Sequence, residues 1–83
     1  MKKIFESPLN GWDEAAERIY VYALENDNEL WAFANMTHDE RCEYFNVFDQ
    51  SDYEVMPGAM YHTYEFKHTC NHVMMIETVA CNV

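Results

Sequence analysis

Alternation between apolar and polar side chains is clearest near the end of the chain, from Tyr53 to Val83. Between Ala59 and Lys67, alternate side chains point to opposite faces of a strand, and one set is suited to face a core. A continuous apolar run from Val73 to Ile76 indicates a second strand, covered on both faces. The two runs and the polar break from Thr69 to His72 predict an antiparallel hairpin. The expected core-facing set in the first strand is Met60, His62, Tyr64 and Phe66.

The register of this hairpin depends on the length of its loop. A two-residue loop, Cys70-Asn71, puts Phe66 opposite Met75. A longer loop puts Lys67 opposite Glu77, which is a favourable charge pair. The sequence leaves both registers open.

Shorter strands are predicted at two other places. Lys2 to Glu6 suits an edge strand, which Pro8 ends because proline cannot donate to the ladder. Tyr53 to Met56 is the second. Pro57-Gly58 follows it and suits the centre of a type II turn, because glycine accepts the positive φ there.

The segment from residue 12 to residue 36 fits two patterns. A single long helix would place apolar residues on its acidic side. We favour a short helix over Trp12–Arg18, followed by strands over Ile19–Leu24 and Leu30–Met36, because β-branched and aromatic residues favour a pleated surface. The sequence alone leaves open whether residues 12–26 form one helix or a helix and a strand.

A second helix is predicted after Thr37. This residue and Glu40 form the capping-box pattern of a helix N-terminus. The helix extends to about Phe45 or Phe48 and is expected to bury Cys42, Tyr44 or Phe45, and Phe48. The resulting element order predicts a single α+β domain over residues 1–83, with a mainly antiparallel sheet of about four strands and two short helices in a single layer on one face.

The charge of the chain is strongly acidic. Its 83 residues have a net charge of −10, and from Ile4 to Phe66 fourteen acids stand against two arginines, a local net charge of −12. Such a field repels nucleic acid and anionic membranes and attracts basic protein surfaces. The acids that we expect to contact a partner are Glu14, Glu17, Glu25, Asp27, Asp39, Glu40 and Glu43. Either a monomer or a homodimer is compatible with a core this small.

Motifs for chemistry are sparse. His68, Cys70 and His72 offer imidazole and thiol groups, but their spacing matches no standard zinc finger or ribbon. We therefore assign no metal and no cofactor, and keep a zinc-stabilised module as an alternative. Pairing Cys42 or Cys70 with a histidine gives a possible nucleophile, but no oxyanion loop or glycine-rich phosphate loop accompanies it, so we expect no enzyme activity.

Other features bear on the compartment and on the core. No apolar run approaches the roughly 20 residues of a membrane span, and Lys2-Lys3 is not followed by the apolar segment of a signal peptide. Three cysteines without framework spacing fit free thiols in the cytoplasm. His62 is expected to be partly buried and hydrogen-bonded to the backbone, with a pH-sensing role as the alternative.

In size, acidity and lack of cofactor motifs, the whole chain resembles the phage-encoded counter-defence inhibitors. These include anti-restriction DNA mimics, anti-CRISPR proteins and uracil-DNA glycosylase inhibitors. Glu6-Ser7-Pro8-Leu9 is similar to the Glu-Ser-hydrophobic-Leu run on the edge strand of the glycosylase inhibitors, although Pro8 replaces the aliphatic residue.

The resemblance implies a non-enzymatic, stoichiometric inhibitor that acts in the host bacterial cytoplasm. It would block the basic nucleic-acid-binding cleft of a host defence nuclease or DNA-processing enzyme by acidic surface mimicry, without binding nucleic acid itself. The alternative is a small cytosolic interaction or regulatory module, dimeric through an exposed strand edge, whose acidity serves only its solubility.

Overall fold

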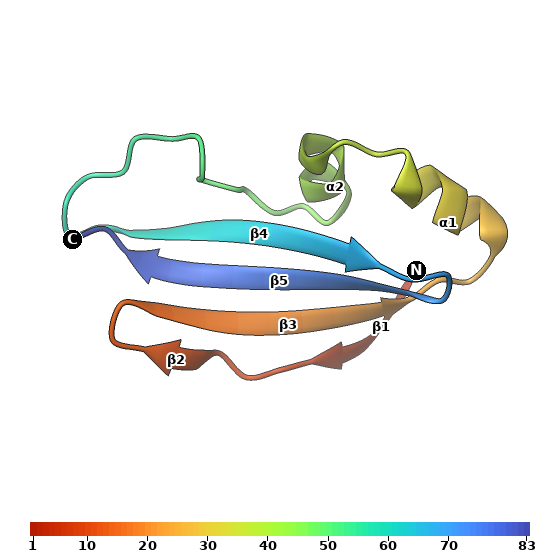
Figure 1. Ribbon diagram of the computed structural model, residues 1–83, viewed down its shortest axis with the longest axis horizontal. Coiled ribbons are helices and arrows are strands. Elements are labelled where there is room, and N and C mark those ends of the chain that lie inside the picture. The colour runs from red at the N-terminus through yellow and green to blue at the C-terminus, as the bar shows by residue number, and fades with distance from the viewer.

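The computed structural model describes residues 1–83. It shows an antiparallel sheet with two helices on one of its faces (Figure 1). This architecture confirms the predicted α+β class with its single helix layer. The elements, in chain order, are β1 (Lys2–Glu6), β2 (Asn10–Trp12), β3 (Ala15–Ala23), α1 (Asp27–Ala34), α2 (His38–Tyr44), β4 (Met60–His68) and β5 (His72–Cys81).

The main strand order is β1-β3-β5-β4, and β2 also pairs with β3. The β4–β5 hairpin has the two-residue loop Cys70-Asn71, and Phe66 lies opposite Met75. The alternative register, with Lys67 opposite Glu77, is wrong. The shorter loop lets the two long strands pair along nearly their whole length.

The helix predicted over Trp12–Arg18 is wrong, because these residues form the β2–β3 hairpin. Asp13 and Glu14 lie in its turn, and β3 begins at Ala15. Gly11 has a φ of +117°, and a Cβ at this position would lie 2.7 Å from the carbonyl oxygen of Ala15. Glycine is therefore required there. The paired ladder of β3 with β5 outweighs the local helical pattern.

The strand predicted over Leu30–Met36 is also wrong. This segment contributes most of α1, whose N-terminus is capped by the Asn26 side chain, which accepts a hydrogen bond of 2.9 Å from the backbone N–H of Glu29. Phe33 is fully buried, whereas Trp31 is 64% exposed. The aromatic residues that suggested a strand therefore lie on different sides of a helix, and the one on the side that meets the sheet is buried.

The loop between α2 and β4 replaces the strand predicted over Tyr53–Met56, which does not form. The turn at Pro57-Gly58 is confirmed: Gly58 has a φ of +83°, and the backbone N–H of Ala59 donates to the carbonyl of Met56 at 3.1 Å. The segment before this turn has no strand partner, so it stays irregular.

The capping box of α2 is confirmed. The Thr37 hydroxyl accepts a hydrogen bond of 3.2 Å from the Glu40 N–H, and the Glu40 carboxylate accepts one of 2.9 Å from the Thr37 N–H. The helix ends at Tyr44 and buries Cys42, as predicted. The predicted burial of Phe48 is wrong, because this side chain lies in the loop after the helix and is 60% exposed. Phe45 follows as the C-cap, so the shorter of the two expected helix ends is the correct one.

Three phenylalanines join the helix layer to the sheet. The ring of Phe45 stacks on that of Phe66 of β4 with 5.7 Å between centroids, and Phe33 meets Phe66 edge-on at 6.2 Å. Tyr22 of β3 adds a tilted contact of 4.6 Å to Phe45. These rings form the centre of a small core, and they fix the position of α2 over β4.

Burial alternates along β5 from His72 to Ala80. Val73 and Met75 are buried beneath the helix layer, while Met74 and Ile76 between them are only partly covered. The expectation that this run is covered on both faces is therefore wrong. The second face of the sheet has no layer packed on it (Figure 1).

The outer edge of β4 is covered by the loop after α2. Gln50 donates its backbone N–H to the carbonyl of His62 at 2.9 Å, and its side-chain oxygen accepts from the His62 N–H at 2.9 Å. Asp49 accepts from the Tyr64 N–H at 3.2 Å. This edge is thus unavailable for strand addition, a usual protection against edge-to-edge association.

The aromatic core predicts unequal effects for two substitutions in α1. Phe33→Ala should destabilise the protein by about 3–5 kcal/mol, because it removes a fully buried ring. Trp31→Ala on the same helix is the control and should change stability by less than about 0.5 kcal/mol, because the indole is mostly exposed. Urea denaturation measures both, and a loss below about 0.5 kcal/mol for Phe33→Ala would show that the core does not depend on Phe33.

Candidate functional site

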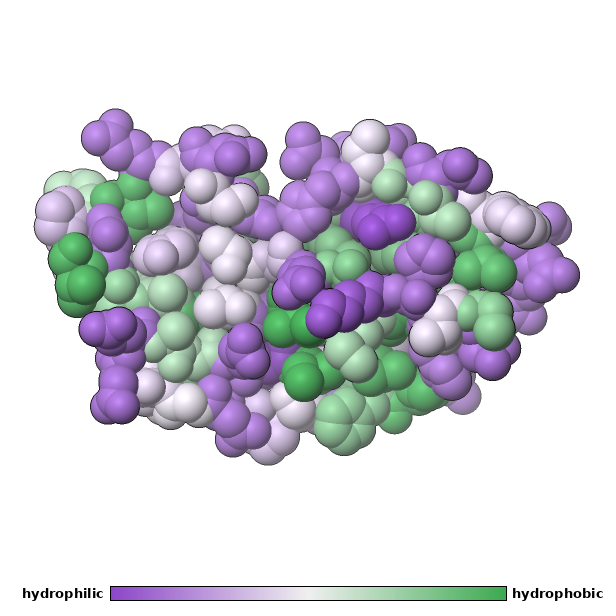
Figure 2. Space-filling model, in the orientation of Figure 1, coloured by the Kyte–Doolittle hydropathy of each residue, from purple (hydrophilic) through white to green (hydrophobic).

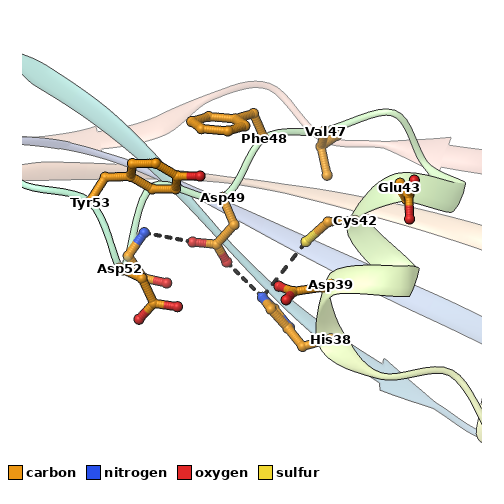
Figure 3. A pocket seen from close by; sticks show the side chains of 10 residues that line it. His38, Asp39, Cys42, Glu43, Val47, Phe48, Asp49, Asp52 and Tyr53 are labelled. Atoms are coloured by element: carbon orange, nitrogen blue, oxygen red, sulfur yellow. Dashed lines mark hydrogen bonds and ion pairs between the residues drawn. The ribbon is translucent and has the colours of Figure 1, made fainter.

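A pocket opens between α2 and the loop that follows it (Figure 3). Its volume is about 550 Å³. Three of its side chains point toward one another in the middle of the lining, while Glu43 and Asp52 lie toward its edges (Figure 3). The lining consists of His38, Asp39, Cys42, Glu43, Val47, Phe48, Asp49, Ser51, Asp52 and Tyr53.

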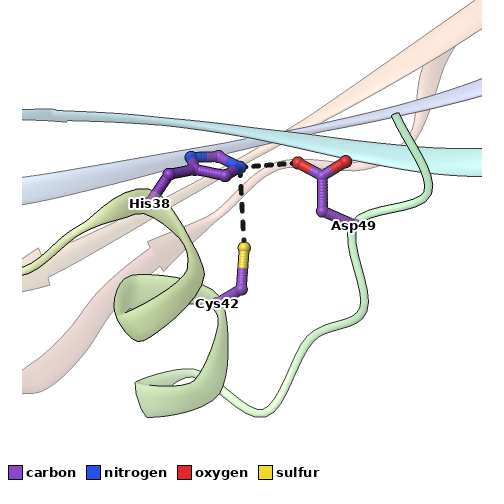
Figure 4. A group of neighbouring side chains, drawn as sticks. All are labelled: His38, Cys42 and Asp49. Atoms are coloured by element: carbon purple, nitrogen blue, oxygen red, sulfur yellow. Dashed lines mark hydrogen bonds and ion pairs between the residues drawn. The ribbon is translucent and has the colours of Figure 1, made fainter. Parts of the chain in front are cut away.

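The three converging side chains are those of His38, Cys42 and Asp49 (Figure 4). His38 and Cys42 lie one turn apart on the same side of α2, as residues at i and i+4 do. The His38 Nε2 atom lies 2.7 Å from a carboxylate oxygen of Asp49 and 3.7 Å from the Cys42 sulfur. One nitrogen therefore faces both partners.

Asp49 is the best-connected of the three. Its side chain is only 8% exposed, and besides His38 it accepts hydrogen bonds from the backbone N–H groups of Ser51 at 2.8 Å and Tyr64 at 3.2 Å. Burial by itself would raise the pKa of Asp49. The hydrogen bonds from His38, Ser51 and Tyr64 outweigh it and hold the pKa below its ordinary value. The carboxylate is thus a fixed anion that joins three segments.

Cys42 is not set up as a nucleophile. Burial raises the pKa of its thiol, and the nearby Asp49 and Asp39 carboxylates raise it further, so the thiol stays protonated at neutral pH. A Cys–His–Asp proton relay also uses both imidazole nitrogens, one toward the thiol and one toward the carboxylate. In this site Nε2 of His38 serves both contacts.

The seven acids predicted from the sequence are all exposed, but they do not form one cluster. Only Asp39 and Glu43 reach the pocket. Six of the seven make no salt bridge, and the exception, Glu25, lies 3.9 Å from the N-terminal ammonium group. Their positions are the β2–β3 turn for Glu14, β3 for Glu17, the segment between β3 and α1 for Glu25, the first turn of α1 for Asp27, and α2 for Asp39, Glu40 and Glu43.

Two of these acids have placements that change their interpretation. Glu17 pairs with Thr78 and projects from the uncovered sheet face, away from the helix layer. Glu40 is part of the α2 capping box, and the hydrogen bonds from Thr37 lower its pKa. Glu40 therefore has a structural role, and Glu17 is separated from the other acids by the sheet.

Glu77 on β5 has a buried carboxylate that the sequence did not predict. In the sequence pattern it is the polar residue that ends an apolar run. It is 7% exposed. The hydroxyl of Tyr64 donates to it at 3.0 Å, the His62 ring nitrogen lies at 3.2 Å, and Arg18 forms an ion pair at 3.7 Å. The expected backbone partner of the His62 ring is therefore wrong, because the ring meets this carboxylate. Only the pairing of β3, β5 and β4 reveals the cluster.

The alternative zinc cluster at the hairpin tip is not assembled. His68, Cys70 and His72 are exposed, and their ligand atoms do not converge. The converging group instead combines Cys42 with His38. The sequence feature that could have indicated this pair is its four-residue spacing on a predicted helix. The third member, Asp49, could not be found by spacing because it belongs to a loop.

No protein-family model, curated protein or solved structure matches this chain. The resemblance to counter-defence inhibitors therefore remains a prediction from size and charge. Neither α1 nor α2 has the length and apolar character that crossing a membrane requires.

The geometry of Asp49 predicts an acid-sensitive contribution to stability. Because its pKa is lower in the folded than in the unfolded chain, this contribution is complete above the ordinary carboxyl pKa and disappears as pH falls through the folded value. Asp49→Asn should therefore be less stable than the wild type at pH 7, and the difference should shrink toward pH 2. Urea denaturation in metal-free buffer from pH 7 to pH 2 measures it. A difference that does not change with pH would contradict this role.

Proposed function

We propose that this chain is a non-enzymatic, stoichiometric inhibitor that occupies the basic nucleic-acid-binding surface of an enzyme. The observation that carries the proposal is a set of nine exposed acids that make no salt bridge. Because no neighbouring cation neutralises these carboxylates, their negative electrostatic field attracts basic surfaces over distances of about a Debye length. They are Asp13, Glu14, Glu17, Asp27, Asp39, Glu40, Glu43, Asp52 and Glu54.

Most of these acids belong to the helix layer and the loop after it. Hydrophilic side chains cover much of the corresponding upper rim of the molecule (Figure 2). The longest extent of the chain is 43 Å, which is comparable to roughly a dozen base pairs of duplex at 3.4 Å each. Acids along such a rim support mimicry of a short run of phosphates.

The same features suggest the class of target. A cleft lined with lysine and arginine gains affinity for an acidic partner by the electrostatics that give it affinity for nucleic acid. A host defence nuclease or DNA-processing enzyme offers such a cleft, and a phage-encoded anti-restriction or anti-CRISPR protein would act on it in the bacterial cytoplasm. The protonated thiol of Cys42 and the shared His38 nitrogen support a role without catalysis.

The contact surface that we propose is the pocket rim. Charge reversal there should weaken partner binding, whereas charge reversal on the uncovered sheet face should not. The variant Glu43→Lys with Asp52→Lys changes two rim acids that lie outside the first turn of α2. Glu17→Lys with Glu65→Lys makes the same change in charge on the uncovered sheet face. The rim variant should capture at least tenfold less of the basic partner from nuclease-treated bacterial lysate, and the sheet-face variant should capture nearly the wild-type amount.

The competition step uses the captured enzyme and its duplex DNA. DNA and this protein should exclude one another, and the binding should weaken as salt rises because the charges are screened. Simultaneous binding of both, or equal losses in the two variants, would contradict the mimicry. Circular dichroism of each variant establishes that it is folded.

A second candidate, a dimeric interaction module, is favoured by the uncovered sheet face. This face carries an apolar centre that includes Ile19 and Ile76, which lie opposite one another. Its charges balance, with two acids and two lysines. The five strands contain 36 residues in all. With about 3.3 Å per residue and about 4.8 Å between strands, they give a footprint of roughly 570 Å², near the lower limit of one side of a stable interface. The charged residues of this face are Glu17, Glu65, Lys2 and Lys67.

A second copy is the occupant that this balance favours, because face-to-face packing keeps the acidic helix layers apart. Sedimentation equilibrium of the wild type should then show a dimer, and Ile76→Lys should convert it to a monomer. Trp31→Lys, which alters an exposed aromatic residue on the helix side, is the control and should leave the dimer intact. A monomeric wild type at high concentration would rule out this candidate.

A further inference from the structure

Three side chains of different chemistry converge at one point of the pocket. The ligand atoms of His38, Cys42 and Asp49 all lie within 4.8 Å of one another, and no other group of three such residues in the chain does so. Tetrahedral zinc with ordinary bond lengths separates a nitrogen from a sulfur by about 3.5 Å and a nitrogen from an oxygen by about 3.3 Å. The observed separations are 3.7 Å and 2.7 Å. Shifts of less than about 1 Å would therefore admit the ion.

We propose that His38, Cys42 and Asp49 bind a zinc-class transition-metal ion. An imidazole nitrogen, a thiolate and a carboxylate are the three donor types that zinc uses in proteins. The thiolate disfavours magnesium and calcium, which prefer all-oxygen sites. The pocket leaves the fourth position open to water or to another ligand, as in zinc sites with three protein ligands.

The ligands are held in place before any ion arrives. His38 and Cys42 project from the same side of α2, whose N-terminus is fixed by its capping box. The carboxylate of Asp49 is oriented by hydrogen bonds from the backbone N–H groups of Ser51 and Tyr64. Such outer contacts orient a ligand and typically strengthen a metal site.

The electrostatics of the pocket also favour a cation. Three exposed acids line it, Asp39, Glu43 and Asp52, and none of them makes a salt bridge. Binding replaces the Cys42 S–H bond with a sulfur–metal bond and releases that proton to solvent. The neutral imidazole of His38 shifts its proton to Nδ1, so that Nε2 presents a lone pair to the metal. The metal's own charge stabilises the thiolate inside the acidic pocket.

The test is a titration of the metal-free protein with Co²⁺ alone and then with Zn²⁺. We expect one Co²⁺ per chain, with the near-ultraviolet charge-transfer absorption of a single cobalt–thiolate bond, and displacement of Co²⁺ by Zn²⁺. Elemental analysis of the gel-filtered zinc complex should give one zinc per chain. The melting temperature should rise with Zn²⁺, because an ion that binds the folded chain stabilises it.

Matched variants separate this site from the other cysteines and histidines. Cys42→Ser should abolish the charge-transfer band, and His38→Gln should weaken binding at least tenfold. Because Cys42 is buried, we expect Cys42→Ser to destabilise the fold. His38→Gln changes a side chain that is 47% exposed and therefore keeps the test available. Cys70→Ser and Cys81→Ser are the controls and should retain full binding.

Two results would overturn the proposal. The first is that the protein binds no Co²⁺ at Co²⁺ concentrations of tens of micromolar and that Zn²⁺ does not change its melting temperature. The His38–Asp49 contact would then only stabilise the packing of α2 against its loop. The second is a cobalt–thiolate band that survives in His38→Gln and Cys42→Ser but disappears in Cys70→Ser. That result would place the ion at the hairpin tip.

Discussion

The contact between the helix layer and the sheet depends on one small aromatic cluster. Phe33 from α1, Phe45 after α2 and Phe66 from β4 place their rings within 6.3 Å of one another. Phe33 is fully buried and the other two rings are partly buried, because a chain of this length encloses little volume. The position of α2, and therefore of the pocket beside it, depends on these rings.

Two buried carboxylates, Glu77 and Asp49, are the centres of the polar contacts on the helix side of the sheet. Glu77 is surrounded by partners from β3 and β4, and Asp49 joins α2, the following loop and β4. A buried carboxylate without partners would be costly, so each one stabilises only the arrangement that supplies its donors. Glu77 thereby favours one alignment of the strands, and Asp49 favours one path of the loop.

Charge is distributed unevenly between the two sides of the molecule. The uncovered sheet face has as many lysines as acids, whereas most unpaired acids belong to the helix layer and its loop. One side is therefore suited to a basic partner and the other to an uncharged surface. The pocket lies on the acidic side, so a bound cation would lower the negative charge where we expect the partner to dock.

The sequence by itself determined those elements whose stability comes from neighbouring residues. The β4–β5 hairpin, the capping box of α2, the turn at Pro57-Gly58 and the α+β class follow from period, caps and turn chemistry. Cys42 was also correctly expected to be buried. For the hairpin, the cap and the turn, the interactions that decide the structure join residues close along the chain.

Tertiary structure decided the rest. Residues 15–18 are a strand because β5 pairs with them, although their local pattern is that of a helix. Residues 30–34 are helical despite aromatic, strand-like composition, because a helix is what buries Phe33 against the sheet. The seven predicted acids fall on different surfaces, and the Glu77 cluster and the group formed by His38, Cys42 and Asp49 exist only after folding. The Glu77 cluster joins strands that are distant in the chain, and Asp49 reaches His38 from an irregular loop. Local periodicity carries no information about which distant segments meet or where a loop places a side chain.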